Sequence, residues 1–486
     1  MNIVFASAEV SPIAKTGGLG DVCGSLPKEM ARLGHDVTVF MPYYRQARQY
    51  FAENGIEPEV VMPPEWVTGG TWTAEIALLR TTLPGSDVPL ILVANDHYYD
   101  REQIHGMLHG IDDFLERYAV FCRAVVMGCV QLGIHPDILH AHDWHTALLP
   151  VHLHAGLRAT PAFRQTRSVY TIHNLHYQGV TGAAAFGMTG LHTRYWASDA
   201  LEHFGELNPM KGGILFADQV TTVSPNYARE IQTPEYGAGL DGVLRSVSHK
   251  FTGILNGIDV EEWDPATDPH LPVHYDRDDP GAKATLKRLL TKEAGLPYSA
   301  PVPLLGVVSR MVEQKGFHLL LPVLGRLLQA GAQAVILGSG DGAIEDGFRY
   351  VADHNPDRCR VWIGFNNALA HRINAASDLL LMPSLYEPCG LNQMYALRYG
   401  TLPVVRLTGG LADTVVPYDG TNGEAANGFG FAHAVSDELY LATWVAMLNR
   451  RDATLWKALQ RNGMQQDFSW SSSARRYEEV YRRAAG

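Results

Sequence analysis

Residues 304–328 read LLGVVSRMVEQKGFHLLLPVLGRLL, and their pattern gives the clearest indication of the fold class. It opens with an unbroken apolar run at Leu304–Val308, which is typical of a strand buried on both faces. After a polar turn, apolar residues return over 317–328 with the spacing of an amphipathic helix. A buried strand followed by a helix is half of a βαβ unit, so we predict a parallel sheet covered by helices.

The same alternation of strand and helix extends in both directions along the chain. A connector over 256–302, rich in proline and aspartate, interrupts it. We therefore expect an α/β protein with two doubly wound domains, residues 1–255 and 256–467, with a final helix in 468–486 that joins the first domain. The other predicted strands are 3–6, 37–41, 90–93, 138–141, 168–172, 334–337, 360–363, Leu379–Met382 and 402–405, and the other predicted helices are 112–132, 282–294, 437–448 and 471–484.

Composition excludes several classes of protein. The 486 residues include 39 Lys and Arg against 51 Asp and Glu, a net charge of −12, which argues against a nucleic-acid partner. Five cysteines without a CxxC pair do not form a disulfide framework or a zinc ribbon. We recognise no signal peptide and no apolar stretch that would span a membrane, so we expect a soluble, cytoplasmic protein.

Two glycine motifs point to anion binding. The sequence TGGLxD occurs at 16–21 and again at 408–413, each time between an apolar run and a helical pattern. Paired glycines at a helix start leave backbone N–H groups open to an anion, and Lys15 adds a positive charge beside the first motif. The alternative is that each motif is only a tight turn.

Charged residues also follow two predicted strands of the second series. Arg310 and Lys315 come after Leu304–Val308, and Glu387 comes after Leu379–Met382. In an open α/β sheet, ligands bind at the carboxyl ends of the strands. The two cations therefore suit a diphosphate leaving group, and the carboxylate suits the hydroxyls of a polyol.

Two further patterns favour other activities. Residues 338–343 read GSGDGA, the alanine form of the dinucleotide fingerprint, which would suit an oxidoreductase. The first strand–helix unit lacks that spacing, because Gly17 lies ten positions after Ser7. Residues 140–145 read HAHDWH, which would suit a metal site, although we prefer hydrogen bonds to a polar ligand. We interpret the DxD at 276–278 as a solvated turn.

Taken together and in this order, the motifs resemble one family. They are KTGGLGD (15–21), HAHDWH (140–145), TIHN (171–174), YQG (177–179), MKGG (210–213), VTTVSP (220–225), GILNGID (253–259), SRMVEQKG (309–316), LGSGD (337–341), SLYEPCGLNQ (384–393) and LTGGLADTV (407–415). This series is similar to that of the bacterial glycogen synthases and plant starch synthases, which are retaining glycosyltransferases. The resemblance extends from residue 3 to about residue 470.

The resemblance implies a GT-B architecture, in which two Rossmann-like domains share a cleft. The implied reaction moves glucose from ADP-glucose to the non-reducing 4-hydroxyl of an α-1,4-glucan such as glycogen, with retention, and releases ADP. It implies no cofactor and no metal. The first domain would face the acceptor and the second the nucleotide-sugar donor, and the oligomeric state stays open.

By motif position, the resemblance also implies roles for particular residues. The catalytic group would be His173, Arg310, Lys315 and Glu387. The donor would be bound by Lys15, Gly17, Gly18, Asp21, Asn174, Asn256, Phe365, Cys389, Gly390 and Leu391, with Phe365 stacked on the adenine. The acceptor side would hold Glu9, Asp143 and Tyr177.

Two positions depart from the family pattern, and two alternatives stay open. Asn392 stands where many relatives have Thr, and after YQG the chain reads VTGAAA (180–185), where relatives usually continue with an aromatic residue such as Phe. Retention allows either a double displacement through Glu387 or a same-face substitution, which we favour. A glycan-binding protein without catalysis would be expected to lack the charged residues Lys15, Arg310, Lys315 and Glu387.

Overall fold

The computed structural model describes residues 1–105 and 113–486. These residues form two compact units. Unit 1 comprises Met1–Val223, Ala228–Gly257 and Trp470–Gly486, and unit 2 comprises Ser224–Tyr227 and Ile258–Ser469. Each unit is an α/β structure built on one large sheet, so the predicted fold class is confirmed.

Unit 2 contains the stretch that begins at Leu304. Its six-stranded sheet is parallel throughout and has the order β15-β14-β13-β16-β17-β18. Counted along the chain, this is the doubly wound order 3-2-1-4-5-6, whose direction reverses between β13 and β16. The strands are β13 Leu304–Val308, β14 Gln333–Gly338, β15 Cys359–Ile363, β16 Leu379–Met382, β17 Leu402–Arg406 and β18 Phe429–Phe431.

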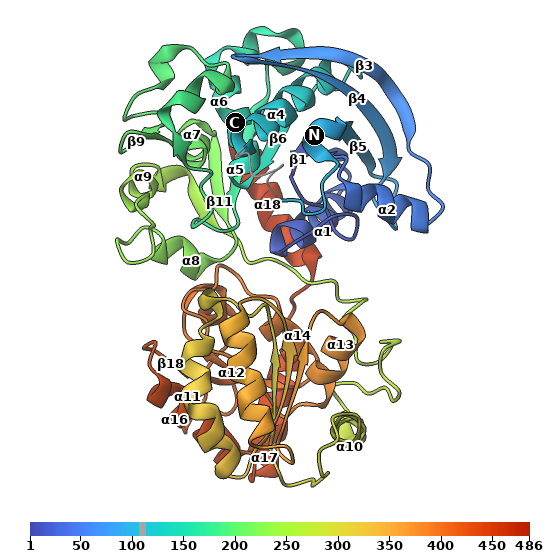
Figure 1. Cartoon of the computed structure of the whole chain (residues 1–486), viewed down its shortest axis with the longest axis vertical. Helices are drawn as coiled ribbons and strands as arrows, with labels where there is room; N and C mark the ends of the chain where they lie inside the picture. The colour runs from blue at the N-terminus through green and yellow to red at the C-terminus, as the bar shows by residue number, and fades with distance from the viewer. Residues whose placement is uncertain (106–112) are drawn as a thin grey trace. The chain divides into compact units, whose positions relative to one another are not determined.

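Helices cover both faces of this sheet, with α11 and α12 on one face and α13 and α10 on the other (Figure 1). Side-chain caps mark several helix starts: Asp341 accepts from the Ala343 amide and Asn366 accepts from the Leu369 amide. The helices are α10 Lys283–Glu293, α11 Phe317–Gln329, α12 Gly342–Asp353, α13 Asn367–Ala376, α14 Asn392–Arg398, α15 Gly409–Thr414, α16 Ser436–Asn449 and α17 Ala453–Met464, and α8 Pro225–Glu230 crosses the boundary with unit 1.

Unit 1 repeats the same order on a larger scale. Its nine-stranded sheet runs β12-β11-β7-β6-β1-β2-β5-β4-β3, and it is parallel from β12 to β5. The reversal of strand order lies between β1 and β6. The strands are β1 Asn2–Ala6, β2 Asp36–Pro42, β3 Glu59–Gly69, β4 Trp72–Thr82, β5 Pro89–Ala94, β6 Ile138–His142, β7 Arg167–Ile172, β11 Gln219–Thr222 and β12 Phe251–Gly253.

The remaining elements of unit 1 are a small sheet and a set of helices. The small sheet joins β8 Thr181–Gly182, β10 Glu206–Leu207 and β9 Glu202–His203. The helices are α1 Gly18–Arg32, α2 Arg45–Glu53, α3 Asp96–Tyr99, α4 Phe114–Gln131, α5 Asp143–Thr146, α6 Leu148–Ala155, α7 Pro209–Phe216, α9 Asp241–Ser246 and α18 Trp470–Ala485. The predicted helix 112–132 corresponds to α4, and its first residue lies outside the described residues.

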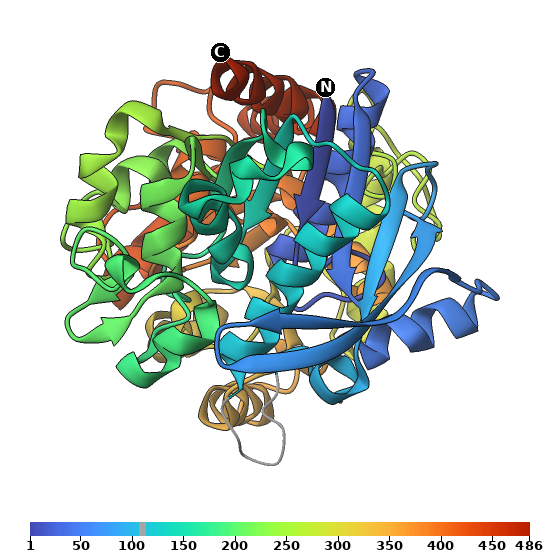
Figure 2. The ribbon, with the colours of Figure 1, turned by 90° about the horizontal axis from the view of Figure 1, so that it is seen from above.

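Helix α18 packs on the N-terminal elements of unit 1, as both views show in red (Figures 1 and 2). Its Tyr477, Val480 and Tyr481 are almost fully buried there. The Tyr481 hydroxyl lies 2.8 Å from Nδ1 of His140, in the middle of β6. The last helix is therefore part of the core of unit 1.

The expectation that all sheets are parallel was wrong at one edge of unit 1. Strands β3, β4 and β5 are antiparallel neighbours, and the long β3–β4 ribbon forms the edge of the sheet (Figure 1). Strand β4 alternates buried and exposed residues, which is the signature of a sheet with one solvated face. In β3 the pairing register shifts between Met62 and Glu65, around two prolines, which obscures the alternation in the sequence.

Candidate active site

The reversal of strand order in unit 2 brings the predicted charged residues together. Lys315 ends a short 3-10 turn after β13, and Glu387 lies in the loop after β16. The Lys315 ammonium is 2.6 Å from Glu387 Oε2, and the Ser384 hydroxyl donates to the same oxygen at 2.9 Å. Both charged side chains are largely buried, whereas Arg310 is exposed. This point of a doubly wound sheet is where ligands bind.

Backbone contacts lock the loops around Glu387 in place. Gly409 has φ +46°, and a Cβ there would lie 1.8 Å from the Glu387 carbonyl oxygen. The next amide, that of Gly410, donates to this carbonyl at 3.0 Å. On the other side, the Gln393 side-chain amide donates to the carbonyls of Cys389 and Gly390. The second TGGLxD motif thus packs against the protein's own backbone.

Asn392, the first departure from the family pattern, has a structural partner. It begins α14, and its side-chain amide donates to the Val308 carbonyl at 2.5 Å. This bond joins the start of α14 to the last residue of β13. The amide therefore helps to hold the two loops that carry Lys315 and Glu387.

In the GSGDGA turn, the protein's own carboxylates bind backbone amides that a dinucleotide phosphate would otherwise use. The Gly340 amide donates to Glu345 Oε1 at 2.9 Å, and the Asp341 carboxylate caps the start of α12. A Cβ on Gly338 would lie 1.9 Å from the Ser309 carbonyl oxygen, so this glycine serves close packing of two loops. Two carboxylates at the helix start would repel a pyrophosphate, which argues against a dinucleotide site.

In unit 1, the first TGGLxD motif is organised by Glu9. Its buried carboxylate accepts from the Thr16 amide, the Thr16 hydroxyl and the Gly17 amide, at 2.6, 2.7 and 3.2 Å. His105 Nε2 lies 2.8 Å from the same carboxylate. Burial alone would raise the pKa of Glu9, but the hydrogen bonds from His105 and Thr16 hold it below its ordinary value. Glu9 therefore shapes the loop with both of its oxygens.

The start of α1 differs from the second glycine motif. A Cβ added to Gly17 or Gly18 would meet no atom within 4 Å. The amides of Gly18 and Leu19 have no hydrogen-bond partner among the described residues. Nearby, Lys15 pairs with Asp21 at 2.6 Å, and both side chains are partly exposed. This helix start can accept an anion, which Lys15 can reach by leaving Asp21.

The loops after β6 and β7 form a buried polar cluster. Asp143 has φ +54°, and its carboxylate accepts from the amides of His173 and Asn174, at 2.7 and 3.4 Å. Burial raises the pKa of Asp143 to about 7, although these amides oppose the rise. His173 Nε2 lies 3.0 Å from His142 Nδ1. Burial lowers the pKa of His173 to about 3, so the ring is neutral at pH 7.

Buried histidines predict acid sensitivity of the fold. Burial lowers the pKa of His140 and His142 well below 6.5, and that of His152 to about 4. The unfolded chain would bind protons near pH 6.5 that the folded chain rejects, so the unfolding free energy falls as the pH drops from about 6.5 towards 4. Denaturant titrations at pH 7.5 and pH 5 should show this loss, of which His152 accounts for about 2 kcal/mol.

A matched pair of variants tests the contribution of one buried histidine, His152, to this acid sensitivity. His152→Gln should reduce the loss of stability between pH 7.5 and pH 5, whereas His135→Gln, at an exposed position, should leave it unchanged. Equal or greater stability at pH 5 in the unmodified protein would contradict the prediction.

The other predicted site residues are placed as follows. Phe365 follows β15 and is 88% exposed, and Tyr177 is 56% exposed. Asn256 is buried, and its Oδ1 has no hydrogen-bond partner among the described residues. Leu391 precedes α14.

The sequence analysis missed two residues that contact the site carboxylates, His105 and Ser384. The position of Ser384, three residues before Glu387, could have indicated its hydrogen bond to that carboxylate, whereas nothing in the local sequence links His105 to Glu9.

The described residues contain neither a cluster suited to a metal ion nor a helix suited to a membrane. Within 1–105 and 113–486, no group of three or more His, Cys, Asp or Glu side chains is arranged to hold a metal ion. His140 contacts Tyr481 and Thr171 instead, and the Asp276 side chain accepts the amides of Asp278 and Asp279 in an exposed turn. None of the helices described combines the length and hydropathy needed to cross a bilayer.

Comparisons with known proteins agree with this geometry. A family model for the starch synthase catalytic domain matches residues 2–246, and one for group 1 glycosyl transferases matches residues 297–439. A glycogen synthase of Anaeromyxobacter dehalogenans is 45% identical over 489 residues, which covers 100% of this chain and 99% of that protein.

Solved structures extend the likeness to three dimensions. The catalytic domain of starch synthase IV from Arabidopsis thaliana, bound to ADP and acarbose, has a TM-score of 0.89 and 35% identity, over 100% of this chain and 99% of that one. A sucrose-phosphate synthase of Thermosynechococcus elongatus shares the fold alone, with a TM-score of 0.61 and 18% identity over 99% and 98% of the chains. The chain therefore belongs to the glycogen and starch synthase family of glycosyltransferases, which has the GT-B fold.

Proposed function

We propose that this protein is a glycogen synthase, which transfers glucose from ADP-glucose to the non-reducing 4-hydroxyl of an α-1,4-glucan, with retention, and releases ADP. The observation that carries the proposal is the Lys315–Glu387 pair at the strand-order reversal of unit 2. It supplies a cation for a leaving phosphate and a carboxylate for sugar hydroxyls in one place. The full-length likeness to a glycogen synthase supports the same reaction.

The diphosphate would be held by cations of the protein. Arg310 is exposed and lies five residues before Lys315 in the same loop after β13, so we expect both side chains to reach phosphate oxygens. The open Gly18 and Leu19 amides at the start of α1 offer a second contact, next to Lys15. These groups neutralise the negative charge that grows on the departing ADP, so the reaction needs neither a metal nor a cofactor.

The transferred glucose would be held by Glu387 and the turn that follows it. The amides of Cys389, Gly390 and Leu391 donate to sugar or phosphate oxygens, and Gly390 adopts φ +73° there. Asp21, Asn174 and the unpartnered Oδ1 of Asn256 offer further contacts to the donor. These groups orient the sugar for attack.

A same-face substitution is the mechanism that best explains retention of the anomeric configuration. Glu387 Oε2 already accepts from Lys315 and Ser384, which weakens this carboxylate as a nucleophile. The acceptor hydroxyl would attack as ADP leaves, and the departing phosphate would take its proton. His173 is neutral at pH 7, so it positions a sugar hydroxyl by hydrogen bonding and does not supply a charge.

On the acceptor side, Tyr177 presents an exposed ring that can stack on a glucan unit. Glu9 and Asp143 would act there indirectly, because their oxygens hold the loops of Gly17 and His173. Within the described residues, none of the five cysteines forms a disulfide, which fits a reaction in the reducing cytoplasm.

The decisive test is release of free nucleoside diphosphate from ADP-glucose and from UDP-glucose, with and without glycogen, in EDTA. Glycogen-dependent release from ADP-glucose is expected, together with an α-linked product by proton NMR. Release from UDP-glucose alone would change the donor, and a β-linked product would reject retention. Absence of release from either donor would reject the proposal.

Phe365 allows a test of nucleotide binding. We expect Phe365→Ala to raise the KM for ADP-glucose about tenfold with little change in kcat, because loss of a base–aromatic stack costs about 1–3 kcal/mol. Tyr350→Ala, which removes another exposed aromatic ring of unit 2, is the matched control and should change neither constant. An unchanged KM in Phe365→Ala would remove the ring from nucleotide binding.

A further inference from the structure

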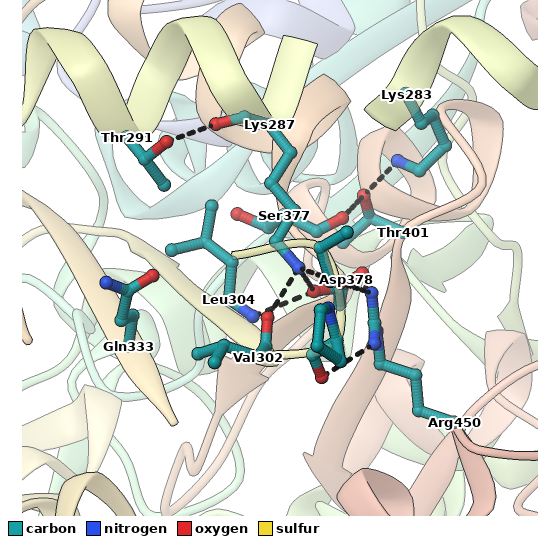
Figure 3. Close-up of polar contacts among 12 residues, drawn as sticks. Lys283, Lys287, Thr291, Val302, Leu304, Gln333, Ser377, Asp378, Thr401 and Arg450 are labelled. Carbon is teal, nitrogen blue, oxygen red and sulfur yellow. Dashed lines mark hydrogen bonds and ion pairs between the residues drawn. The ribbon is translucent and has the colours of Figure 1, made fainter. Parts of the chain in front are cut away.

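A second cluster of charges lies at the opposite edge of the sheet of unit 2. It surrounds Asp378, the residue before β16 (Figure 3). Asp378 Oδ2 accepts from the Lys287 ammonium at 2.7 Å and from the Leu304 amide at 2.8 Å. Its Oδ1 lies 2.8 Å from Arg450 Nε. The Asp378 carboxylate thus pairs with two cations and also accepts a hydrogen bond from the first amide of β13.

A third cation of the cluster has no carboxylate partner among the residues that the structure describes. The Lys283 ammonium, on α10, donates to the carbonyls of Ala375 and Tyr399 and to the Thr401 hydroxyl, at 2.7, 2.9 and 2.8 Å. All three acceptors are neutral. Burial lowers the pKa of Lys283 to about 7, although Asp378 opposes this shift. A buried ammonium without a counter-ion is unfavourable, and a nearby anion would relieve it.

A cavity lies beside these cations. Its volume is about 240 Å³, several times the roughly 30 Å³ that one water molecule occupies in the liquid. Four cationic side chains line it against a single carboxylate, that of Asp378. Trp456 and Tyr298 supply aromatic walls. The cationic lining residues are Lys283, Lys287, Arg450 and Lys457.

The cavity is separate from the candidate active site. Asp378 precedes β16 and binds the first amide of β13, so the cluster lies at the amino ends of these two neighbouring strands. Arg310, Lys315 and Glu387 follow the carboxyl ends of the same strands. The two charged sites therefore lie at opposite ends of strands β13 and β16.

We propose that this cavity binds a small phosphate-bearing molecule. Arg450 and the exposed Lys457 contact the phosphate group, and Lys283 and Lys287 contribute positive charge from within the wall. The aromatic side chains of Trp456 and Tyr298 face whatever small organic part the molecule carries. The bound anion supplies the counter-charge that Asp378 alone cannot give to the four cations.

The test uses the full chain and inorganic phosphate as the probe. Calorimetric titrations are run at constant ionic strength without nucleotide, and the Lys457 variants assign the binding signal to this cavity rather than to the donor site of the proposed function. Phosphate should bind and raise the Tm. Lys457→Glu should weaken this binding at least tenfold and abolish the rise in Tm, because it places a negative charge at the exposed rim of the cavity.

Matched variants separate the site from general charge effects. Lys457→Arg should keep phosphate binding, and Lys292→Glu, which makes the same charge change at an exposed position of α10, should not weaken it. Absence of phosphate binding in the unmodified protein, or equal affinity in Lys457→Glu, would overturn the proposal. The comparison of variants needs no catalysis, so failure of the proposed function would not be mistaken for failure of this site.

Discussion

Lys315→Ala is expected to lower turnover about a hundredfold, the largest effect on catalysis that we predict. The Lys315 ammonium lies beside Glu387 at the strand-order reversal, where a leaving diphosphate would develop charge. Removing one preorganised charge-stabilising group costs about 2.7 kcal/mol of transition-state stabilisation, which corresponds to that factor in rate. Steady-state ADP release from ADP-glucose with glycogen measures it.

Two controls make this result specific. Lys292→Ala removes an exposed lysine of α10, outside the candidate active site, and should leave turnover unchanged. Glu387→Gln should also slow the reaction, and the double variant should lose less than the sum of the two effects, because the side chains are in contact. A change below threefold in Lys315→Ala would remove Lys315 from its proposed role.

Gly409→Ala is expected to lower the free energy of unfolding by about 3 kcal/mol. An alanine there would be strained at φ +46°, and its Cβ would overlap the Glu387 carbonyl oxygen. Relief of this overlap must shift the backbone of Glu387, so activity should fall with stability. Denaturant unfolding and ADP release measure the two effects on the same sample.

The matched variant lies in the other glycine motif. Gly18→Ala meets open space, so its stability should stay within about 0.5 kcal/mol of the unmodified protein. If an anion binds the start of α1, the same variant should raise the KM for ADP-glucose. Equal stability losses at Gly18 and Gly409 would contradict the distinction between a site open to ligand and a site filled by backbone.

Strand ends were the most informative part of the sequence. Unbroken apolar runs predict buried parallel strands, and the carboxyl ends of such strands meet at one edge of the sheet. That reasoning placed Lys315 and Glu387 at the same edge of the sheet, and the structure shows their charged atoms 2.6 Å apart. It did not need side-chain detail, because the topology alone brings these loops together.

Contacts between distant segments could not be predicted in this way. His105 and Glu9 are 96 residues apart, and no periodicity links them. The two glycine motifs are alike in sequence, yet only the second packs against another loop, since the difference arises from its neighbours. The antiparallel β3–β4 ribbon was missed because a register shift near its prolines hides the alternation.

The place of α18 has a consequence for how the polypeptide is made. Unit 1 needs residues 470–486, whose tyrosines fill its core and reach His140. In the sequence, residues 258–469 of unit 2 come between this helix and the earlier parts of unit 1. A ribosome therefore releases all of unit 2 before it can supply the helix that completes unit 1. During synthesis, the apolar surface that α18 covers stays uncovered until residues 470–486 have been made, and such a surface favours transient aggregation or chaperone binding.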